Sequence, residues 1–418
     1  MTTWTRGTVD ETVEAVNALT ARWAAVTTGT AGDARAAGPG DTGGTVFSAA
    51  AVWPLLAFLA DGASGPARAE LAEAVGLPAE RAADRAREFL AAADRLRGVD
   101  AALGLWTHRR LKVREEWTAK LPPRTHGKLT GWHALDRRAL DAWAAECTDG
   151  RVTRMPGGLS RHAELVLASA FTLATRWIRP FTAESALPRK GPWSARQLAG
   201  LSRTTSLLDR VGVADTPAGH VTGLRVVGDR GIDVHLLLGE PGMPAGRVLA
   251  AGVDVLAGRQ ALVPGSRLPQ GEAGPGLTVE SVRNWYPARP KLHVRTVAFD
   301  IAAEHDLTAR ADVFGLRSAT RASADFPGIS GRRLAVTRAR QSATAAFTDQ
   351  GFEAAVVTAI AMGETSAREP EPKYTNREVH ACFHRPFGFL AVHQASRLVL
   401  AAGWVTDPQP YRETEMDW

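Results

Sequence analysis

Helical and strand patterns occupy different parts of this chain, and no linker separates them. Helical patterns dominate residues 9–96, whereas strand patterns dominate after Gly200. The 418 residues contain no internal repeat and no Ser/Pro-rich linker at which the chain would divide. Because segregation of helices from strands is typical of α+β folds, we expect one α+β domain over residues 1–418, although this length exceeds the usual size of a domain.

Hydrophobic periodicity gives approximate bounds for these elements. Residues 49–60 are apolar on all sides, which predicts a buried helix. The expected helices lie at 9–26, 49–60, 66–76, 78–96 and 139–147. The expected strands lie at 45–48, 101–107, 165–174, 221–227, 232–238, 292–302, 343–361 and 387–405.

The basic side chains do not form a stripe of the kind that binds nucleic acid. The chain has 50 Lys and Arg against 44 Asp and Glu, and acidic and basic residues are interspersed, as in residues 80–88. This pattern is typical of a solvated helix face with oppositely charged neighbours. No apolar run is long enough for a transmembrane helix. We therefore expect neither a nucleic-acid partner nor a membrane span.

The cysteines and the first residues bear on the compartment. Cys147 and Cys382 are the only cysteines, and two cysteines so far apart do not make a disulfide framework. Residues 1–7 have no apolar signal core. The sequence therefore predicts a cytoplasmic protein, or an extracellular one if a leader has been removed.

Five segments carry recognisable motifs in order along the chain. They are a Trp-containing helix end at 143–151, a central strand and its exit at 168–181, an Ala-Asp-Phe-Pro-Gly-Ile-Ser segment at 324–330, an acidic hinge at 349–355, and an Arg-Pro-Phe strand followed by a closing Gly-x-Val-x-x-Pro at 383–408. Together they resemble the motifs of the serpins, the serine protease inhibitor superfamily. The enrichment in Arg and Ala suggests a GC-rich genome, so we expect a bacterial member with a divergent hinge.

The resemblance implies a fold and a functional loop. The fold would have three β-sheets with surrounding helices, an exposed reactive-centre loop at about 349–378 and C-terminal strands at 379–408. A serine or cysteine protease recognises and cleaves such a loop as a substrate. After cleavage it inserts into the main sheet as an extra strand and distorts the acyl-enzyme. The expected function is suicide-substrate inhibition by a monomer, with a protease as partner and no cofactor.

The expected hinge is built from alternating residues. If 352–364 is a strand, one face is apolar from Phe352 to Met362, while the other carries small residues after Glu353. Pro370 and Pro372 prevent continuation as a central strand. Without the resemblance, a fixed strand followed by an ordinary surface loop would be the preferred interpretation. The hinge residues are Asp349, Gly351, Phe352, Glu353, Ala354 and Ala355.

Phe352 departs from the family pattern, in which Thr or Ser usually leads the insertion. A phenylalanine would have to displace core side chains as it passes between two strands, and overpacking costs about 1–3 kcal/mol. A barrier of that size slows insertion roughly ten- to hundredfold. Because insertion competes with deacylation, we expect inefficient inhibition, with much of the protein consumed as substrate.

The residues at the place where a serpin sheet opens also differ from the family pattern. Ser48 keeps one usual serine and Ala51 replaces the second. Ser169 stands where the family usually has Asn, and Gln341 where it has His. Trp177, at the expected insertion point, is retained. The hydrogen bonds that hold a serpin sheet shut are therefore expected to differ here.

The scissile bond has several candidates. Counting from the hinge at the usual spacing places Thr365 before the bond and Ser366 after it. The segment from hinge to Arg-Pro-Phe motif is about ten residues longer than usual in the family, so Arg368, Lys373 or Arg377 could be recognised instead. Any of those three would imply a trypsin-like target.

The alternative is a serpin scaffold that no longer inhibits, used as a binding protein or recruited as an enzyme in a bacterial biosynthetic pathway. His380, Cys382 and His384 alternate, so on a strand they would share one side and could hold zinc. No fourth ligand is evident, and such residues are often ordinary core groups, so we expect no metal. No nucleophile elbow or phosphate-binding loop indicates a reaction class.

Overall fold

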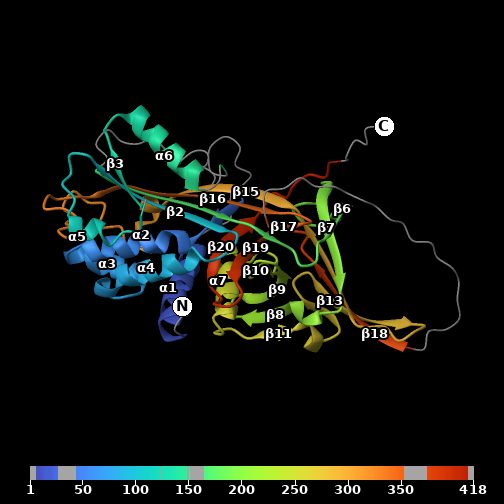
Figure 1. The fold of residues 1–418 in the computed structure, drawn as a ribbon. Coiled ribbons are helices and arrows are strands. Elements are labelled where there is room, and N and C mark those ends of the chain that lie inside the picture. The colour runs from blue at the N-terminus through green and yellow to red at the C-terminus, as the bar shows by residue number, and fades with distance from the viewer. Residues whose placement is uncertain are drawn as a thin grey trace.

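The computed structural model describes residues 6–26, 44–123, 125–147, 150, 164–352 and 374–412. Within these ranges the chain is an α+β fold of three β-sheets with surrounding helices, as the sequence predicts (Figure 1). None of the described helices combines the length and apolar character that a transmembrane span requires.

A group of helices from the first quarter of the chain packs around one end of the molecule (Figure 1). The buried helix α2 begins where the Ser48 side chain accepts a hydrogen bond from the backbone N–H of Ala51. Helix α3 ends at Gly76, which adopts φ +74°, a conformation that favours glycine. The helices are α1 (Arg6–Ala25), α2 (Ala49–Gly62), α3 (Gly65–Val75), α4 (Ala79–Ala93), α5 (Glu115–Thr118), α6 (His133–Cys147), α7 (Ala245–Leu256) and α8 (Ala311–Phe314).

One of the two seven-stranded sheets, here called the main sheet, has the strand order β3-β2-β4-β16-β17-β5, with β15 also paired to β16. Helix α6 lies over one face of it, and helices α2 to α4 lie on the opposite side (Figure 1). Its strands are β2 (Val99–His108), β3 (His126–Leu129), β4 (Leu165–Leu173), β5 (Thr175–Arg176), β15 (Phe299–Asp306), β16 (Val336–Phe347) and β17 (Gly351–Phe352).

The core sheet has the order β1-β20-β19-β10-β9-β8-β11, and its strands β19 and β20 are buried along almost their entire length. Continuous apolar runs of this kind indicate strands covered on both faces. Its strands are β1 (Thr45–Phe47), β8 (Val211–Thr216), β9 (Gly219–Val227), β10 (Ile232–Gly239), β11 (Leu262–Pro264), β19 (Phe387–His393) and β20 (Val399–Val405).

The third sheet has the order β12-β13-β18-β14-β7-β6 and lies at the far end from the helical group (Figure 1). Strand β18 is therefore an interior strand, paired antiparallel to β13 and parallel to β14. Its strands are β6 (Thr182–Ala186), β7 (Leu198–Thr205), β12 (Gly271–Gly274), β13 (Leu277–Asn284), β14 (Lys291–Val297) and β18 (Tyr374–Cys382).

Three strand predictions are divided in the structure, and the one at 387–405 becomes the antiparallel pair β19 and β20. The prediction at 292–302 becomes β14 in the third sheet and β15 in the main sheet, separated at the fully buried Ala298. The backbone N–H of Ala298 bonds to the carbonyl of Ala199, so the chain changes sheets without an exposed turn that sequence could signal. The prediction at 343–361 is divided by a turn at 348–350, and residues 353–361 lie outside the described ranges.

Candidate functional site

Gly351 and Phe352 form a two-residue strand at one end of the main sheet. Phe352 pairs with Phe347 at the end of β16 on one side and with Thr175 of β5 on the other. Its side chain is only 1% exposed, and its ring packs edge-on against Phe389 of the core sheet, with centroids 5.7 Å apart. The base of the expected loop is therefore part of the sheet, with its aromatic side chain in the core.

The turn that precedes this strand is bound by the segment that follows β5. The indole N–H of Trp177 donates to the carbonyl of Thr348 over 2.9 Å, and its backbone N–H donates to the carbonyl of Gln350 over 2.9 Å. The Trp177 ring also packs on Phe347, with centroids 4.8 Å apart. Gly351 is required here because an added Cβ would lie 2.4 Å from the carbonyl oxygen of Thr175.

Beyond this turn, β4 and β16 pair directly with each other in parallel. The paired residues run from Leu165 and Val336 at one end to Phe171 and Ala343 at the other. We call this line of pairing the β4–β16 seam. A further strand could lie along β16 only if the seam opened, because each strand edge has one set of backbone hydrogen-bonding groups.

A buried polar cluster lies in the middle of the seam. Gln341 and Ser169 are opposite each other in the seam, and Ser48 precedes helix α2; all three are fully buried. The Gln341 side-chain oxygen accepts from the backbone N–H of Ser48 over 2.8 Å, and its nitrogen donates to the Ser48 carbonyl over 2.8 Å and to the Ser169 hydroxyl over 3.3 Å. The Ser48 hydroxyl donates to the carbonyl of Leu400 over 2.6 Å. Gln341 thus links both sides of the seam to the start of α2.

The other end of the expected loop is also held in a sheet. Strand β18 begins at Tyr374, and residues 374–381 pair residue by residue with β13. On its second side, residues 378–382 pair with β14. Segment 353–373 is therefore connected at both ends to strands within sheets.

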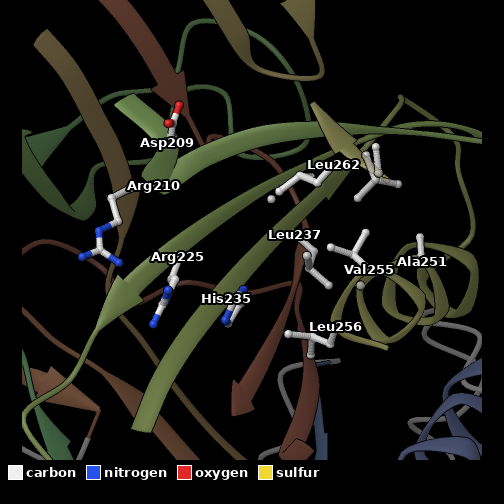
Figure 2. Close-up of a pocket in the computed structure, with 13 residues that line it drawn as sticks. Asp209, Arg210, Arg225, His235, Leu237, Ala251, Val255, Leu256 and Leu262 are labelled. Carbon is white, nitrogen blue, oxygen red and sulfur yellow. The ribbon is translucent and has the colours of Figure 1, made fainter. Parts of the chain in front are cut away.

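A cavity of about 230 Å³ lies between the core sheet and helix α7. Figure 2 shows Arg210, Arg225 and His235 toward one end, while Leu237, Val255, Leu256 and Leu262 gather at the other. Asp209 also lines the polar end (Figure 2), where its carboxylate accepts a hydrogen bond from the backbone N–H of Ser266 over 3.0 Å. The cavity is therefore amphipathic, with an apolar part and a charged part that carries two arginines and one carboxylate.

The polar end of the cavity is organised by a buried carboxylate. Asp233, 1% exposed, pairs with the guanidinium of Arg225 and accepts from the side-chain amide of Gln394 over 2.7 Å. Among the described residues, Arg210 has no such carboxylate partner. His235 borders the cavity, but protein atoms enclose most of its ring; burial lowers the pKa of His235 to about 4, with Asp233 opposing and Arg225 adding to the shift. The ring is therefore neutral at pH 7.

The family was established by comparison with a sequence model. The model described as "Serpin (serine protease inhibitor)" matches residues 35–190 and 267–408, which is more than half of the chain. The chain belongs to the serpin family. A comparison with curated proteins gave no match.

Solved serpins have the same fold at low sequence identity. A complex of human thyroxine-binding globulin with thyroxine has a TM-score of 0.70 at 16% identity, covering 96% of this chain and 100% of that one. Serpin48 of the insect Tenebrio molitor has a TM-score of 0.66 at 17% identity, covering 95% and 98%. Native protease nexin-1 with heparin has a TM-score of 0.68 at 15% identity, covering 96% and 99%. These likenesses show the serpin fold, which a thyroxine-binding protein shares with other serpins.

The serpin hinge predicted from the sequence is only partly within the described residues. Asp349 lies in the turn, and Gly351 and Phe352 form β17. Several other predicted residues lie outside the described ranges: Glu353, Ala354, Ala355, Thr365, Ser366, Arg368 and Lys373. Arg377, one alternative for protease recognition, lies within β18, where its guanidinium donates to the carbonyls of Gly265 and Leu268. An arginine bonded within a sheet does not suit an exposed recognition residue, which argues against this alternative.

The location of Phe352 changes the physical argument about this serpin's hinge. The sequence suggested that the aromatic ring would have to pass between two strands after cleavage. The ring is instead already seated in the core of the uncleaved chain, opposite Phe347. If a cleaved loop were to insert, the cost of accommodating this ring would therefore not arise during insertion, and the β4–β16 seam would have to open.

The predicted sheet-opening residues fall into two groups. Ser48, Ser169 and Gln341 meet in the seam cluster, and Ala51 contributes its backbone N–H to Ser48. Trp177 lies apart from them, at the turn before β17. The sequence missed Thr348, whose carbonyl binds Trp177 and whose hydroxyl donates to the carbonyl of Gly351 over 3.1 Å. A threonine followed by one aspartate in a turn is a weak signal on its own.

The predicted trio of His380, Cys382 and His384 is not gathered in one place. Strand β18 ends at Cys382, and the His384 ring lies 3.3 Å from the Cys382 carbonyl oxygen, not beside His380. The His380 ring stacks instead on His293 of β14, with centroids 4.8 Å apart. Burial raises the pKa of the Cys382 thiol, which opposes formation of a thiolate. The pairing of β14 with β18, which the sequence cannot reveal, determines these neighbours.

Proposed function

We propose that this serpin is a suicide-substrate inhibitor of serine or cysteine proteases, acting by insertion of its cleaved loop into the main sheet. The position of β17 carries the proposal, because its two residues already pair with the end of β16, on the side where the β4–β16 seam lies. A chain that continued beyond Phe352 in the same direction would run along β16, antiparallel to it. Insertion would thus extend a strand that is already paired with β16, so no new strand pairing would have to begin.

The two anchors of the loop explain why cleavage would be the trigger. Before cleavage, Phe352 is held in the main sheet and Tyr374 begins β18 in the third sheet. Extending β17 along the seam would draw the loop away from β18, which is paired on both sides. Cleavage between 353 and 373 removes that constraint and leaves the hinge side free to insert.

The yield of trapped protease then depends on how quickly the seam opens. Opening breaks the β4–β16 pairing and the bonds from Gln341 to Ser169 and Ser48. We propose that inhibition is inefficient because this step competes with deacylation, and each unsuccessful event releases cleaved serpin. The protein would act as a monomer, and a basic residue at the scissile bond, such as Arg368, would select a trypsin-like target.

A gel assay tests this function with a matched pair of variants. The wild type is incubated separately with trypsin-like, elastase-like and subtilisin-like proteases, and a covalent band that survives denaturation is expected with at least one. If the strand alternation continues beyond Phe352, residue 354 faces the core and residue 355 faces outward. Ala354→Arg should then abolish the band while cleavage persists, whereas Ala355→Arg should retain it. Cleavage by every protease with no covalent band would contradict inhibition.

The amphipathic cavity supports a second candidate function, the binding of a small organic anion. Its apolar end would take a hydrophobic or aromatic body, and Arg210 would face the anionic group. The fold is shared with thyroxine-binding globulin, whose complex contains thyroxine. An aromatic sulfonate dye that fluoresces in apolar sites should bind with one site per chain. Arg210→Ala and the cavity-filling Ala251→Phe should each weaken binding about tenfold or more; unchanged binding in both would exclude this cavity.

A further inference from the structure

Three potential metal ligands meet on the third sheet, across the pair of strands β14 and β18. His293 lies directly opposite His380, and Glu378 precedes His380 by two residues on the same side of β18. One ligand atom of each residue lies within 4.8 Å of the others, and all three side chains are partly buried. The cluster is distinct from the seam, the cavity and the hinge described above.

The orientation of His293 suits a ligand. Its Nε2 lies 3.1 Å from a carboxylate oxygen of Glu378, and its Nδ1 lies 3.1 Å from the hydroxyl of Thr204 on β7. Ligand atoms around a tetrahedral zinc ion lie about 3.4 Å apart, given zinc–nitrogen and zinc–oxygen distances near 2.1 Å. The spacing between these two donor atoms is therefore already close to that of a shared ion. Thr204 holds the ring from behind, as outer partners of metal-binding histidines commonly do.

His380 can complete the set by a modest change. Its ring lies nearly parallel to that of His293, with an interplanar angle of 11°. Rotation about χ2 of histidine meets only a broad, shallow barrier. A small turn of either ring would direct a third donor atom toward the point between His293 and Glu378, and a fourth position would remain for water.

The charges around the cluster are compatible with a cation. Glu280 of β13 lies directly opposite Glu378, and like charges in this arrangement repel each other. The Nζ of Lys291 lies 3.6 Å from the second carboxylate oxygen of Glu378. Among the described residues it is the lysine or arginine nearest to this carboxylate, and its side chain is 46% exposed. An exposed lysine can turn toward solvent when another cation arrives.

We propose that His293, Glu378 and His380 form a binding site for a zinc-class divalent ion. Two imidazoles and one carboxylate are a donor set that zinc takes in proteins, with the fourth position open. A bound ion would connect β14 to β18, the strand into which the 353–373 segment leads. It would therefore strengthen the attachment of that segment to the third sheet.

Zinc titration of the chelator-treated full chain tests the site. Calorimetry with zinc chloride should give one ion per chain with roughly micromolar or tighter affinity, and zinc should raise the urea midpoint of unfolding. His293→Ala and Glu378→Gln should each weaken binding about tenfold or more. Glu378→Gln keeps the shape of the side chain, so it remains informative if His293→Ala does not fold.

Matched controls distinguish this site from the trio that the sequence suggested. Cys382→Ser and His384→Ala remove potential ligands from the same segment, and both should bind zinc as the wild type does. The proposal is overturned if the wild type binds no zinc, if Glu378→Gln and His293→Ala both bind it normally, or if the two control variants lose it.

Discussion

The side-chain amide of Gln341 donates a hydrogen bond to the hydroxyl of Ser169 directly across the line where β4 and β16 pair, over 3.3 Å. The same amide forms two bonds with the backbone of Ser48, which precedes α2. One buried side chain therefore connects the strands that would have to separate with the helix beneath them. Separation of β4 from β16 would therefore break that cluster.

Replacing Gln341 should destabilise the uncleaved protein and hasten insertion. Gln341→Leu leaves the Ser48 N–H and carbonyl and the Ser169 hydroxyl buried without these partners. We expect a loss of about 2–3 kcal/mol in the free energy of unfolding, measured by urea denaturation, and a larger trapped fraction of protease. Thr337→Val, which removes one bond of 2.8 Å to the Leu165 carbonyl at the end of the seam, is the control. It should cost about 1 kcal/mol, and equal losses in both variants would argue against a special role for the cluster.

Replacing Phe352 should remove the anchor of the loop. Phe352→Thr takes a buried aromatic side chain from its contact with Phe389, so the free energy of unfolding should fall by about 3 kcal/mol. The trapped fraction of protease should also fall, because the strand that insertion extends is no longer seated. Chemical denaturation and the gel assay measure the two effects. An increase in the trapped fraction would support the opposite view, in which the large ring obstructs insertion.

Acid should destabilise the protein through His235. The pKa of His235 is about 4 in the folded protein, chiefly because of burial, whereas an unfolded histidine titrates near 6.5. Between these values the unfolded state binds more protons, so the free energy of unfolding rises with pH from about 4 to 6.5 and is level above that range. The contribution of His235 should be roughly 2 kcal/mol, because its contact with the cavity reduces the full effect.

Urea midpoints between pH 4 and pH 7.5 measure this contribution. His235→Gln should flatten the profile, while His133→Gln, at an exposed histidine at the start of α6, should leave it unchanged. Burial also lowers the pKa of His126 and of His393, so some slope should remain in every variant. If the urea midpoint of His235→Gln still rises with pH as steeply as that of the wild type, a group other than His235 causes the pH dependence.

The fold was accessible from the sequence because its signals are local. The helix over 49–60 follows from apolar residues on all sides, and the hairpin of β9 and β10 follows from the turn between them. The family motifs then indicated three sheets. The seam cluster was partly accessible, since Ser48, Ser169 and Gln341 occupy family positions.

The features that were missed depend on pairing between distant segments. Phe352 is seated because β5 and Phe389 surround it, and neither neighbour can be deduced from its own sequence context. His293 meets His380 only because β14 pairs in parallel with β18 in one register. The division at Ala298 was missed because a run of apolar residues has the same pattern whether it stays in one sheet or changes sheets.

The melting temperature of the protein before and after a single cut within 353–373 tests the central claim, that the cleaved loop inserts along the β4–β16 seam. Limited proteolysis supplies the cut, and calorimetry compares the nicked and intact chains under the same conditions. Burial of several aliphatic side chains at about 1.5–3 kcal/mol each should raise the melting temperature by about 10 °C or more. An unchanged or lower melting temperature in the nicked protein would mean that the seam stays closed, and it would contradict inhibition by loop insertion.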